Sequence, residues 1–290
     1  MKDVSVIFVN YKTPELTVNA INSVYEKTEN LDFEIIVVDN NSNDGSVEIL
    51  KSKFPGVKII ENSENSGFGA ANNLAIKISD AKYVFCLNTD TLLVNNAIKI
   101  LFDFMEKNLR VGACGGFLTD ENGSPVDCGG NFPNFTEILW KFGPRYVFKQ
   151  AYKKYKLTIN SADTVHTKRL GYITGADIMF RKSVLADVGL FDEKFFMYYE
   201  ETDLCKRIKD AGFDIKFVPS AKIVHLEGRS CDVPLTKKKR SKKSEFYYFK
   251  KHSPACLPFV KFCYVILYLA EAVFTMSGDS LELAKYVATL

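Results

Sequence analysis

The sequence predicts an α/β fold with a mainly parallel, twisted sheet, helices on its faces and a helical C-terminal extension. Short apolar runs rich in Val, Ile and Phe alternate with runs of helical periodicity through roughly the first 110 residues. The connections are short, and three of the first four predicted strands end in clusters rich in Asn or Asp. Such alternation gives parallel strands joined by right-handed crossovers, with ligands bound outside the carboxyl ends of the strands.

The N-terminal half contains four predicted strands, which are short and rich in β-branched and aromatic residues. They are expected at residues 4–9, 33–38, 57–60 and 83–87. Helices are expected between them, beginning near Pro14, at a Ser46 cap and after residue 73. Because loops are often polar, the Asn- and Asp-rich strand ends do not by themselves establish a functional site.

The fourth strand ends in Asn88, Thr89 and Asp90. An acid at the carboxyl end of a buried strand can hold a divalent cation, which can in turn hold a diphosphate. The alternative is structural, because Asn88 and Asp90 could cap a helix that begins at Thr91. The motif alone does not separate the two interpretations.

A dinucleotide-binding Rossmann domain does not fit the strand ends. That fold needs a G-x-G-x-x-G loop directly after the first strand. Here Asn10, Tyr11 and Lys12 follow that strand, and the later Gly67-x-Gly69 pair lacks the third glycine. A sugar nucleotidyltransferase would need a glycine-rich basic loop at the same place, and that loop is missing too.

Composition points to a protein of the reducing cytoplasm. The chain has 290 residues, 47% of them hydrophobic, which is enough for one large domain or one domain with an extension. The seven cysteines are odd in number and form no C-x-x-C pair, so neither a disulfide framework nor a zinc site is expected. The first residues enter a strand-like run directly, so no signal peptide is expected.

The second half is less regular at first and then ordered again. Residues 112–168 are rich in turns, aromatic side chains and lysines, which suits either an acceptor-side loop or an ordinary surface subdomain. A short helix is expected at residues 183–188, and a strand at residues 215–218 that Pro219 ends. Between them Glu200, Glu201 and Asp203 open a helix behind an aromatic run, and three acids exceed what a helix dipole requires.

Several motifs recur in the order and spacing of a known family. They are Val9-Asn10-Tyr11, Val37-Val38-Asp39-Asn40-x-Ser42-x-Asp44-Gly45, Asn65-x-Gly67-Phe68-Gly69-x-x-Asn72-Asn73, Leu87-Asn88-Thr89-Asp90, Thr174-Gly175-Ala176, Gly189-x-Phe191-Asp192-Glu193, Glu200-Glu201-x-Asp203-Leu204-Cys205-x-Arg207 and Val224-His225-x-x-Gly228-x-Ser230. Over roughly the first 230 residues the chain resembles the family 2 glycosyltransferases with the GT-A fold, and it is most similar to their rhamnosyltransferase-like branch.

The resemblance implies an inverting transfer of sugar from a nucleotide diphosphate, with dTDP-rhamnose as the candidate donor, to a hydroxyl of a growing, lipid-linked surface polysaccharide. It implies Mg²⁺ or Mn²⁺ held by Asp90 and His225, and Glu201 as the general base, with Glu200 and Asp203 as alternatives. The implied donor-binding residues are Asn10, Tyr11, Asp39, Asn65, Gly67, Asn72, Asn88, Thr174 and Gly175.

Two departures from the family pattern bear on these roles. Asn88 stands in place of the first acid of a D-x-D motif, so metal binding depends more on Asp90. Glu201 stands where the family usually has Asp, which adds one methylene of reach. The alternative is an inactive GT-A protein that binds nucleotide sugars or serves as a scaffold, and the retained acids argue against it. A nucleic-acid binder is not supported, because one lysine run is no binding motif.

The C-terminal extension, residues 231–290, follows a catalytic domain expected at residues 1–230, with a nucleotide-binding half to residue 110 and an acceptor half beyond it. A basic run at residues 237–243 precedes an apolar segment at residues 257–274, which Pro258, Lys261 and Glu271 interrupt. About 20 uninterrupted apolar residues are expected for a membrane span, so none is predicted. The segment suits the surface of an anionic membrane, or a helical pair that packs on the domain or forms a homodimer.

Overall fold

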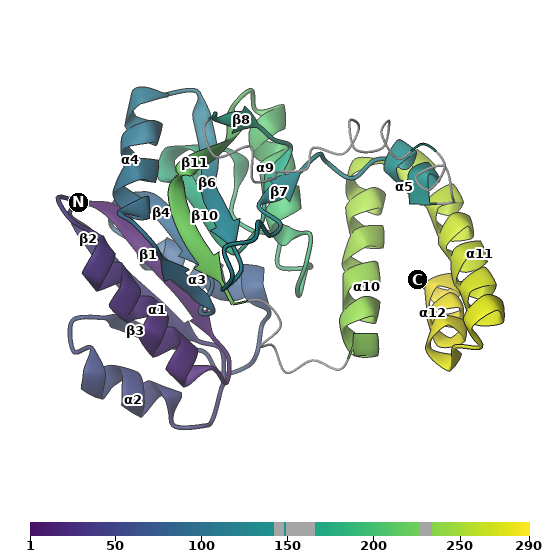
Figure 1. Ribbon diagram of the computed structural model, residues 1–290, viewed down its shortest axis with the longest axis horizontal. Helices are drawn as coiled ribbons and strands as arrows, with labels where there is room; N and C mark the ends of the chain where they lie inside the picture. Colours follow the sequence, from purple (N-terminus) through teal and green to yellow (C-terminus); the bar gives the residue numbers. More distant parts are fainter. Residues whose placement is uncertain (142–147, 149–165, 227–233) are drawn as a thin grey trace.

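The computed structural model describes residues 1–141, 148, 166–226 and 234–290. Its main feature is a mixed sheet with the strand order β3-β2-β1-β4-β10-β6-β11-β5, in which β8 also pairs with β11 (Figure 1). The strands are β1 (Lys2–Asn10), β2 (Phe33–Asp39), β3 (Lys58–Glu61), β4 (Ala81–Leu87), β5 (Thr91–Leu93), β6 (Val111–Thr119), β8 (Lys168–Arg169), β10 (Asp177–Arg181) and β11 (Asp214–His225). A separate ribbon pairs β7 (Gly129–Gly130) with β9 (Tyr172–Ile173).

Helices lie on both faces of the sheet, as predicted (Figure 1). They are α1 (Pro14–Lys27), α2 (Ser46–Lys53), α3 (Phe68–Ile78), α4 (Ala97–Lys107), α8 (Lys182–Val188) and α9 (Glu200–Asp210). Strands β3, β2, β1 and β4 are parallel, while β10 runs antiparallel between β4 and β6. The carboxyl ends of β1, β2 and β4 therefore share one edge of the sheet, which is where the candidate site lies.

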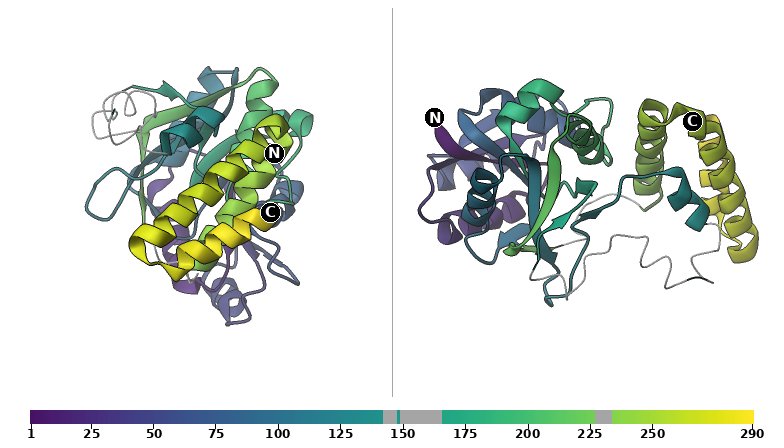
Figure 2. Two further views of the ribbon diagram at one scale, coloured as in Figure 1. Left: turned by 90° about the vertical axis from the view of Figure 1, so that its right-hand side faces the viewer. Right: turned by 90° about the horizontal axis from the view of Figure 1, so that it is seen from above.

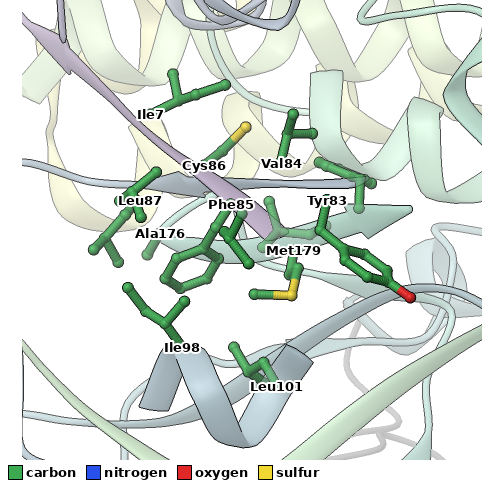
Figure 3. Packing of buried hydrophobic residues seen from close by; sticks show 14 of the residues in the cluster. Ile7, Tyr83, Val84, Phe85, Cys86, Leu87, Ile98, Leu101, Ala176 and Met179 are labelled. Carbon is green, nitrogen blue, oxygen red and sulfur yellow. The ribbon is translucent and has the colours of Figure 1, made fainter. Parts of the chain in front are cut away.

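The core is built around β4, the strand predicted at residues 83–87. Every residue from Tyr83 to Leu87 is buried. Side chains alternate along the strand, so that Phe85 points toward Ile98 and Leu101 of α4 and Val84 points to the opposite face (Figure 3). Each fully buried side chain of this size contributes about 1.5–3 kcal/mol, so the strand end is anchored rigidly.

Two local predictions and one alternative interpretation were wrong. No helix begins at Thr91, because residues 91–93 form β5 and pair with the end of β11. Pro219 does not end a strand: β11 continues to His225 with a register shift between Phe217 and Lys222, since proline removes only one ladder hydrogen bond. Ser46 is the first residue of α2 and not its cap, which is Gly45 in the left-handed region at φ 82°.

The C-terminal residues form a helical subdomain with its own hydrophobic core. It contains α10 (Pro234–His252), the short η2 (Pro254–Cys256), α11 (Leu257–Thr275) and α12 (Gly278–Thr289), joined by α5 (Phe135–Lys141) from the middle of the chain. Ile138, Phe249, Tyr264 and Leu283 are among its buried residues. Helix α10 lies next to the sheet domain, and α11 and α12 lie beyond it (Figures 1 and 2).

Candidate active site

Two polar side chains face each other at the ends of β1 and β2. Asn10 and Asp39 are register partners in these parallel strands, and both are buried. The amide Nδ2 of Asn10 donates to Asp39 Oδ1 at 2.7 Å, and the backbone N–H of Ser42 donates to Asp39 Oδ2 at 3.0 Å. Thr17 Oγ1 donates to the side-chain oxygen Oδ1 of Asn10 at 2.8 Å. The Asp39 carboxylate is therefore held in one orientation. Tyr11, the residue that follows Asn10, is 42% exposed.

A second group of amides joins the end of β2 to the loop before α3. Asn40 Nδ2 donates to Asn65 Oδ1 at 2.9 Å, and Asn40 Oδ1 accepts from Asn62 Nδ2 at 3.0 Å. Asn65 was predicted to bind the donor, whereas Asn40 and Ser42 had no predicted role. Both occur in the D-N-x-S motif after β2, so the motif was the available signal for them.

Gly67 has a backbone reason to be glycine. Its φ is +86°, and a Cβ built on it would lie 2.0 Å from the carbonyl oxygen of Phe196. The same carbonyl accepts a hydrogen bond from Phe68 N at 3.0 Å. This close approach joins the N-terminal end of α3 to the loop that precedes α9. Asn72, another predicted donor residue, is buried one turn later and donates to the carbonyl of Phe68 at 2.9 Å.

The Asn88-Thr89-Asp90 motif is half-buried at the end of β4. Asn88 N donates to the carbonyl of Ala176 at 2.9 Å, which fixes the motif against the start of β10. Pairing of β5 with β11 places Thr91 opposite His225. As a result, the carboxylate Oδ1 of Asp90 lies 3.3 Å from His225 Nε2, although 135 residues of chain separate the two (225 − 90).

Asp90 and His225 fit a hard divalent cation that takes its remaining ligands from elsewhere. One carboxylate oxygen and one imidazole nitrogen converge, and their side chains are 22% and 14% exposed. Among the described residues no group of three or more His, Cys, Asp and Glu is arranged to hold a metal ion. Mg²⁺ is commonly bound through one or two carboxylates, with water and substrate phosphates completing its shell, so the Asp90 carboxylate fits this mode and His225 would add a nitrogen ligand.

The acidic pair at the start of α9 lies at the same edge as Asn88. A Cβ built on Gly175 would lie 4.0 Å from Glu201 Cγ and 3.2 Å from the ring of Phe68. Gly175 directly precedes Ala176, whose carbonyl accepts the hydrogen bond from Asn88. Thr174 and Gly175 are half-exposed beside them. Glu201 therefore lies close to the backbone segment that holds the Asn88 motif.

The two glutamates differ in their surroundings. Glu200 is 4% exposed, and burial together with the charge of Glu201 raises its pKa well above the ordinary range. Glu201 is half-buried, and burial raises the pKa of its carboxyl group to about 7. Burial and the neighbouring charge thus both favour the neutral form of Glu200, while Glu201 can exchange a proton near neutral pH, as a general base must.

Backbone strain marks the entry to this helix. Tyr198 and Tyr199, the two residues before Glu200, have φ values of 69° and 70°. Residues other than glycine cost about 1–3 kcal/mol each in this region, and such strain is concentrated at functional sites.

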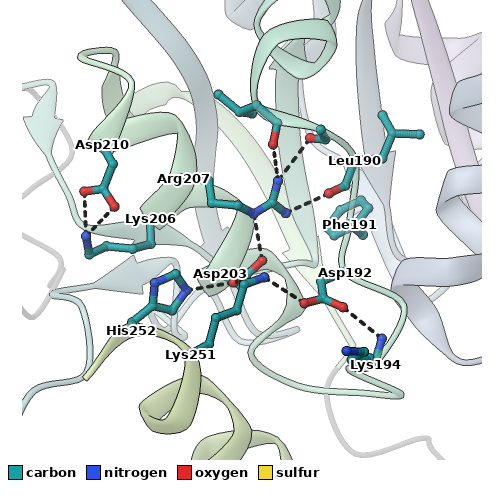
Figure 4. A network of polar contacts seen from close by, with 12 residues as sticks. Leu190, Phe191, Asp192, Lys194, Asp203, Lys206, Arg207, Asp210, Lys251 and His252 are labelled. Carbon is teal, nitrogen blue, oxygen red and sulfur yellow. Dashed lines mark hydrogen bonds and ion pairs between the residues drawn. The ribbon is translucent and has the colours of Figure 1, made fainter. Parts of the chain in front are cut away.

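Asp203 has a different role from the glutamates. Its carboxylate is fully buried and contacts Arg207 Nε at 2.9 Å, Lys251 Nζ at 2.8 Å and His252 Nε2 at 2.7 Å (Figure 4). Lys251 also reaches Asp192 at 2.7 Å. Because two cations and an imidazole occupy its oxygens, Asp203 is the weakest of the three candidate bases. It instead joins α9 to the end of α10, and the sequence offered no signal for its distant partners.

Some predicted features fall outside the described residues. These are Gly228 and Ser230 of the last motif and most of the basic, aromatic stretch between residues 142 and 165.

Comparison with known proteins shows the family to which the chain belongs. Residues 5–184 match the model of the family Glycosyl transferase family 2. The chain is similar to the N-acetylglucosaminyl-diphospho-decaprenol L-rhamnosyltransferase of Mycobacterium tuberculosis, with 28% identity over 212 residues that make up 68% of this chain and 67% of the relative.

Two solved structures share the fold. The mannosyltransferase PcManGT from Pyrobaculum calidifontis in complex with GDP-Man and Mn²⁺ has a TM-score of 0.58 and 15% identity, over 99% of this chain and 86% of that one. GalNAc-T7 with UDP, GalNAc and Mn²⁺ has a TM-score of 0.59 and 16% identity, over 86% of this chain and 50% of that one.

Proposed function

The chain belongs to glycosyl transferase family 2 and has the GT-A fold, and from this premise we propose that it is an inverting, metal-dependent glycosyltransferase. It transfers a sugar from a nucleotide-diphosphate donor to a hydroxyl of a lipid-linked glycan during synthesis of a surface polysaccharide. The observation that supports this most directly is the convergence of Asp90 on His225 at the sheet edge that also carries Asp39, Asn88 and Glu201.

Donor binding follows from the polar edge of the sheet. The fixed Asp39 carboxylate can accept hydrogen bonds from the base or ribose, and the exposed ring of Tyr11 can border the base. Asp90 and His225 would hold Mg²⁺ or Mn²⁺, which when bound neutralises charge that develops on the leaving diphosphate. Both structural neighbours were solved with Mn²⁺, which supports a divalent cation in this chain.

Glu201 is the proposed base. Its carboxylate would take the proton of the acceptor hydroxyl as that oxygen attacks the anomeric carbon and the bond to the diphosphate breaks. A base with a pKa near the working pH combines the deprotonated form with a useful affinity for the proton. The raised pKa of the neighbouring Glu200 favours the neutral form of that residue, which reduces repulsion between two adjacent carboxylates.

The test is Glu201→Gln, with Asp210→Asn on the same helix as the matched control. We expect Glu201→Gln to keep donor affinity, measured by calorimetry with UDP and dTDP sugars, while kcat falls about 10²–10⁴-fold. Asp210 is exposed, and its ion pair among the described residues is with Lys206 across one helical turn, so its variant should keep normal turnover. Near-normal turnover of Glu201→Gln would assign the base to another residue.

The proposed donor is dTDP-rhamnose, because the Mycobacterium tuberculosis relative is a rhamnosyltransferase that acts on a decaprenol-linked sugar. A panel of dTDP- and UDP-sugars, assayed by nucleotide release with Mn²⁺ present, tests this choice. If nucleotide were released only from UDP-hexoses, the donor would be a UDP-hexose and not dTDP-rhamnose. Donor binding without any release would favour the alternative of an inactive sugar-nucleotide-binding protein.

We further propose that the enzyme works in the cytoplasm. The described cysteines are all free thiols, and five of the six are buried, as expected for small apolar side chains in a reducing compartment. A nucleotide-sugar donor is consistent with this location.

A further inference from the structure

Helix α11 has two apolar faces, and among the described residues only the inner face is buried in a core, while on the outer face Phe259 has a ring contact with Phe135 of α5. Its inner face packs Val260, Tyr264 and Tyr268 into the core of the helical subdomain. Its outer face carries a stripe of exposed side chains at alternating spacings of three and four, which places them on one side of the helix. They are Phe259, Phe262, Ile266, Leu269 and Val273, between 40% and 75% exposed.

The exposed surface continues past the end of the helix. Phe274 is 87% exposed and Met276 is 94% exposed, at the turn that leads into α12. By length and composition the segment Pro254–Thr275 could cross a membrane, and only 22% of its most apolar window is buried. Most of this window is therefore exposed, unlike the core helix of a soluble protein. Exposed apolar surface of this extent marks an interface with another protein or with lipid.

The residues that flank the stripe favour lipid over a second copy of the chain as the partner of this face. A helical seam between two copies is usually flanked by charged side chains that set the partner and the register. Here the flanking positions are Val265, Ala270 and Ala272, and the charged residues of α11, Lys261 and Glu271, lie off the stripe by helical spacing. An apolar face without charged flanking residues suits contact with lipid acyl chains, because lipid, unlike a partner helix, needs no fixed register.

Exposed positive charge lies on α10, the helix that shares the subdomain core with the inner face of α11. On α10, Lys237, Lys238 and Lys243 are exposed, and Lys239 connects their helix to α12 through an ion pair with Glu282. Basic side chains beside an apolar helix attract anionic headgroups. The same stretch of α10 contacts the site: the Arg240 guanidinium lies 5.2 Å from the ring centre of Phe196, the residue whose carbonyl approaches Gly67.

We propose that the outer face of α11 and the α11–α12 turn dock this protein on an anionic lipid bilayer, with α11 lying in the plane of the interface. The helix does not span the membrane, because its inner face is committed to the subdomain core, where Tyr264 donates to the buried Glu245 at 2.7 Å. This docking goes beyond the proposed function, and it would bring the site to lipid-linked acceptors through α10.

The test uses the full chain and vesicles of phosphatidylglycerol or of phosphatidylcholine, without donor or acceptor. The double variant F262S/I266S removes two stripe residues, and I78S/V94S removes two equally exposed apolar residues from the sheet domain as the control. We expect wild type and control to co-float with phosphatidylglycerol vesicles and much less with phosphatidylcholine. F262S/I266S should bind about tenfold less or weaker still.

Equal binding of F262S/I266S and wild type, or no binding of wild type to either vesicle, would overturn the proposal. Light scattering tests whether a second copy of the chain, and not lipid, covers this face. A wild-type dimer that F262S/I266S converts to a monomer, together with absent flotation, would assign the face to a second copy of the chain. Donor turnover with a water-soluble acceptor should be unchanged in F262S/I266S, so failure of docking and failure of the proposed function are distinguishable.

Discussion

Replacing Asp203 with Asn should destabilise the protein strongly, even though the two side chains have the same shape. The carboxylate has no exposed surface and contacts Arg207, Lys251 and His252 at 2.7–2.9 Å. The variant leaves these groups packed around a neutral amide, whose N–H₂ group would face a cation. The penalty arises from the buried charges that lose their counter-ion, and not from lost volume.

The magnitude follows from the burial of the partners. Removing one member of a buried ion pair typically costs 3–5 kcal/mol. Arg207 and Lys251 are 20% and 28% exposed and can regain some hydration, so we expect the lower end, about 3 kcal/mol. At roughly 2–4 °C per kcal/mol, Tm should fall by about 6–12 °C in a thermal melt.

Asp210→Asn is the control, because it also removes a carboxylate from an ion pair on α9. That pair with Lys206 is exposed, and such pairs contribute about 0–1 kcal/mol. Its Tm should therefore stay within about 3 °C of wild type. If both variants melted together, the buried network would be no stronger than a surface pair, and the reasoning would fail.

Two further predictions concern the proposed chemistry. Burial raises the pKa of Glu201 to about 7, and a base acts only when deprotonated, so kcat with a soluble acceptor should rise with pH up to about 7 and level off above it. The residual kcat of Glu201→Gln should not rise with pH in this range. A wild-type kcat that does not change with pH would exclude a group with that pKa as the base. Asp90→Asn should weaken Mn²⁺ binding in calorimetry more than His225→Ala does, because it removes a charged ligand. Unaltered Mn²⁺ affinity in His225→Ala would remove the role given to that histidine.

The parts of the fold that depend on local pattern were predictable. β4 lies where a short apolar run ended in polar residues, because a strand buried on both faces needs such a run. The helix expected at Thr91 was not found, because Asn and Asp occur both at helix caps and at strand ends. Only the pairing of β5 with β11, far along the chain, decides between them.

In the candidate site, too, contacts that follow from local pattern were predictable and long-range contacts were not. The pairing of Asn10 with Asp39 follows from parallel strands whose ends coincide, so clusters at both ends were informative. The contact between Asp90 and His225 could be expected only from the family resemblance, because no local pattern relates them. The anchoring of Asp203 could not be predicted, since Lys251 and His252 reach it from a C-terminal helix with no motif of its own.

Two functions of the C-terminal helices can be separated by one pair of variants. Lys251 contacts Asp203 at 2.8 Å and Asp192 at 2.7 Å, and so connects α10 to the helix that begins with Glu200 and Glu201. Lys251→Met keeps the aliphatic stem but removes the charge, and it leaves the outer face of α11 untouched. If α10 positions the acidic pair, kcat with a soluble acceptor should fall while vesicle binding persists, whereas F262S/I266S should show the opposite. Loss of both properties in Lys251→Met would mean that the subdomain unfolds or detaches as one unit, and that positioning and docking are not separate functions.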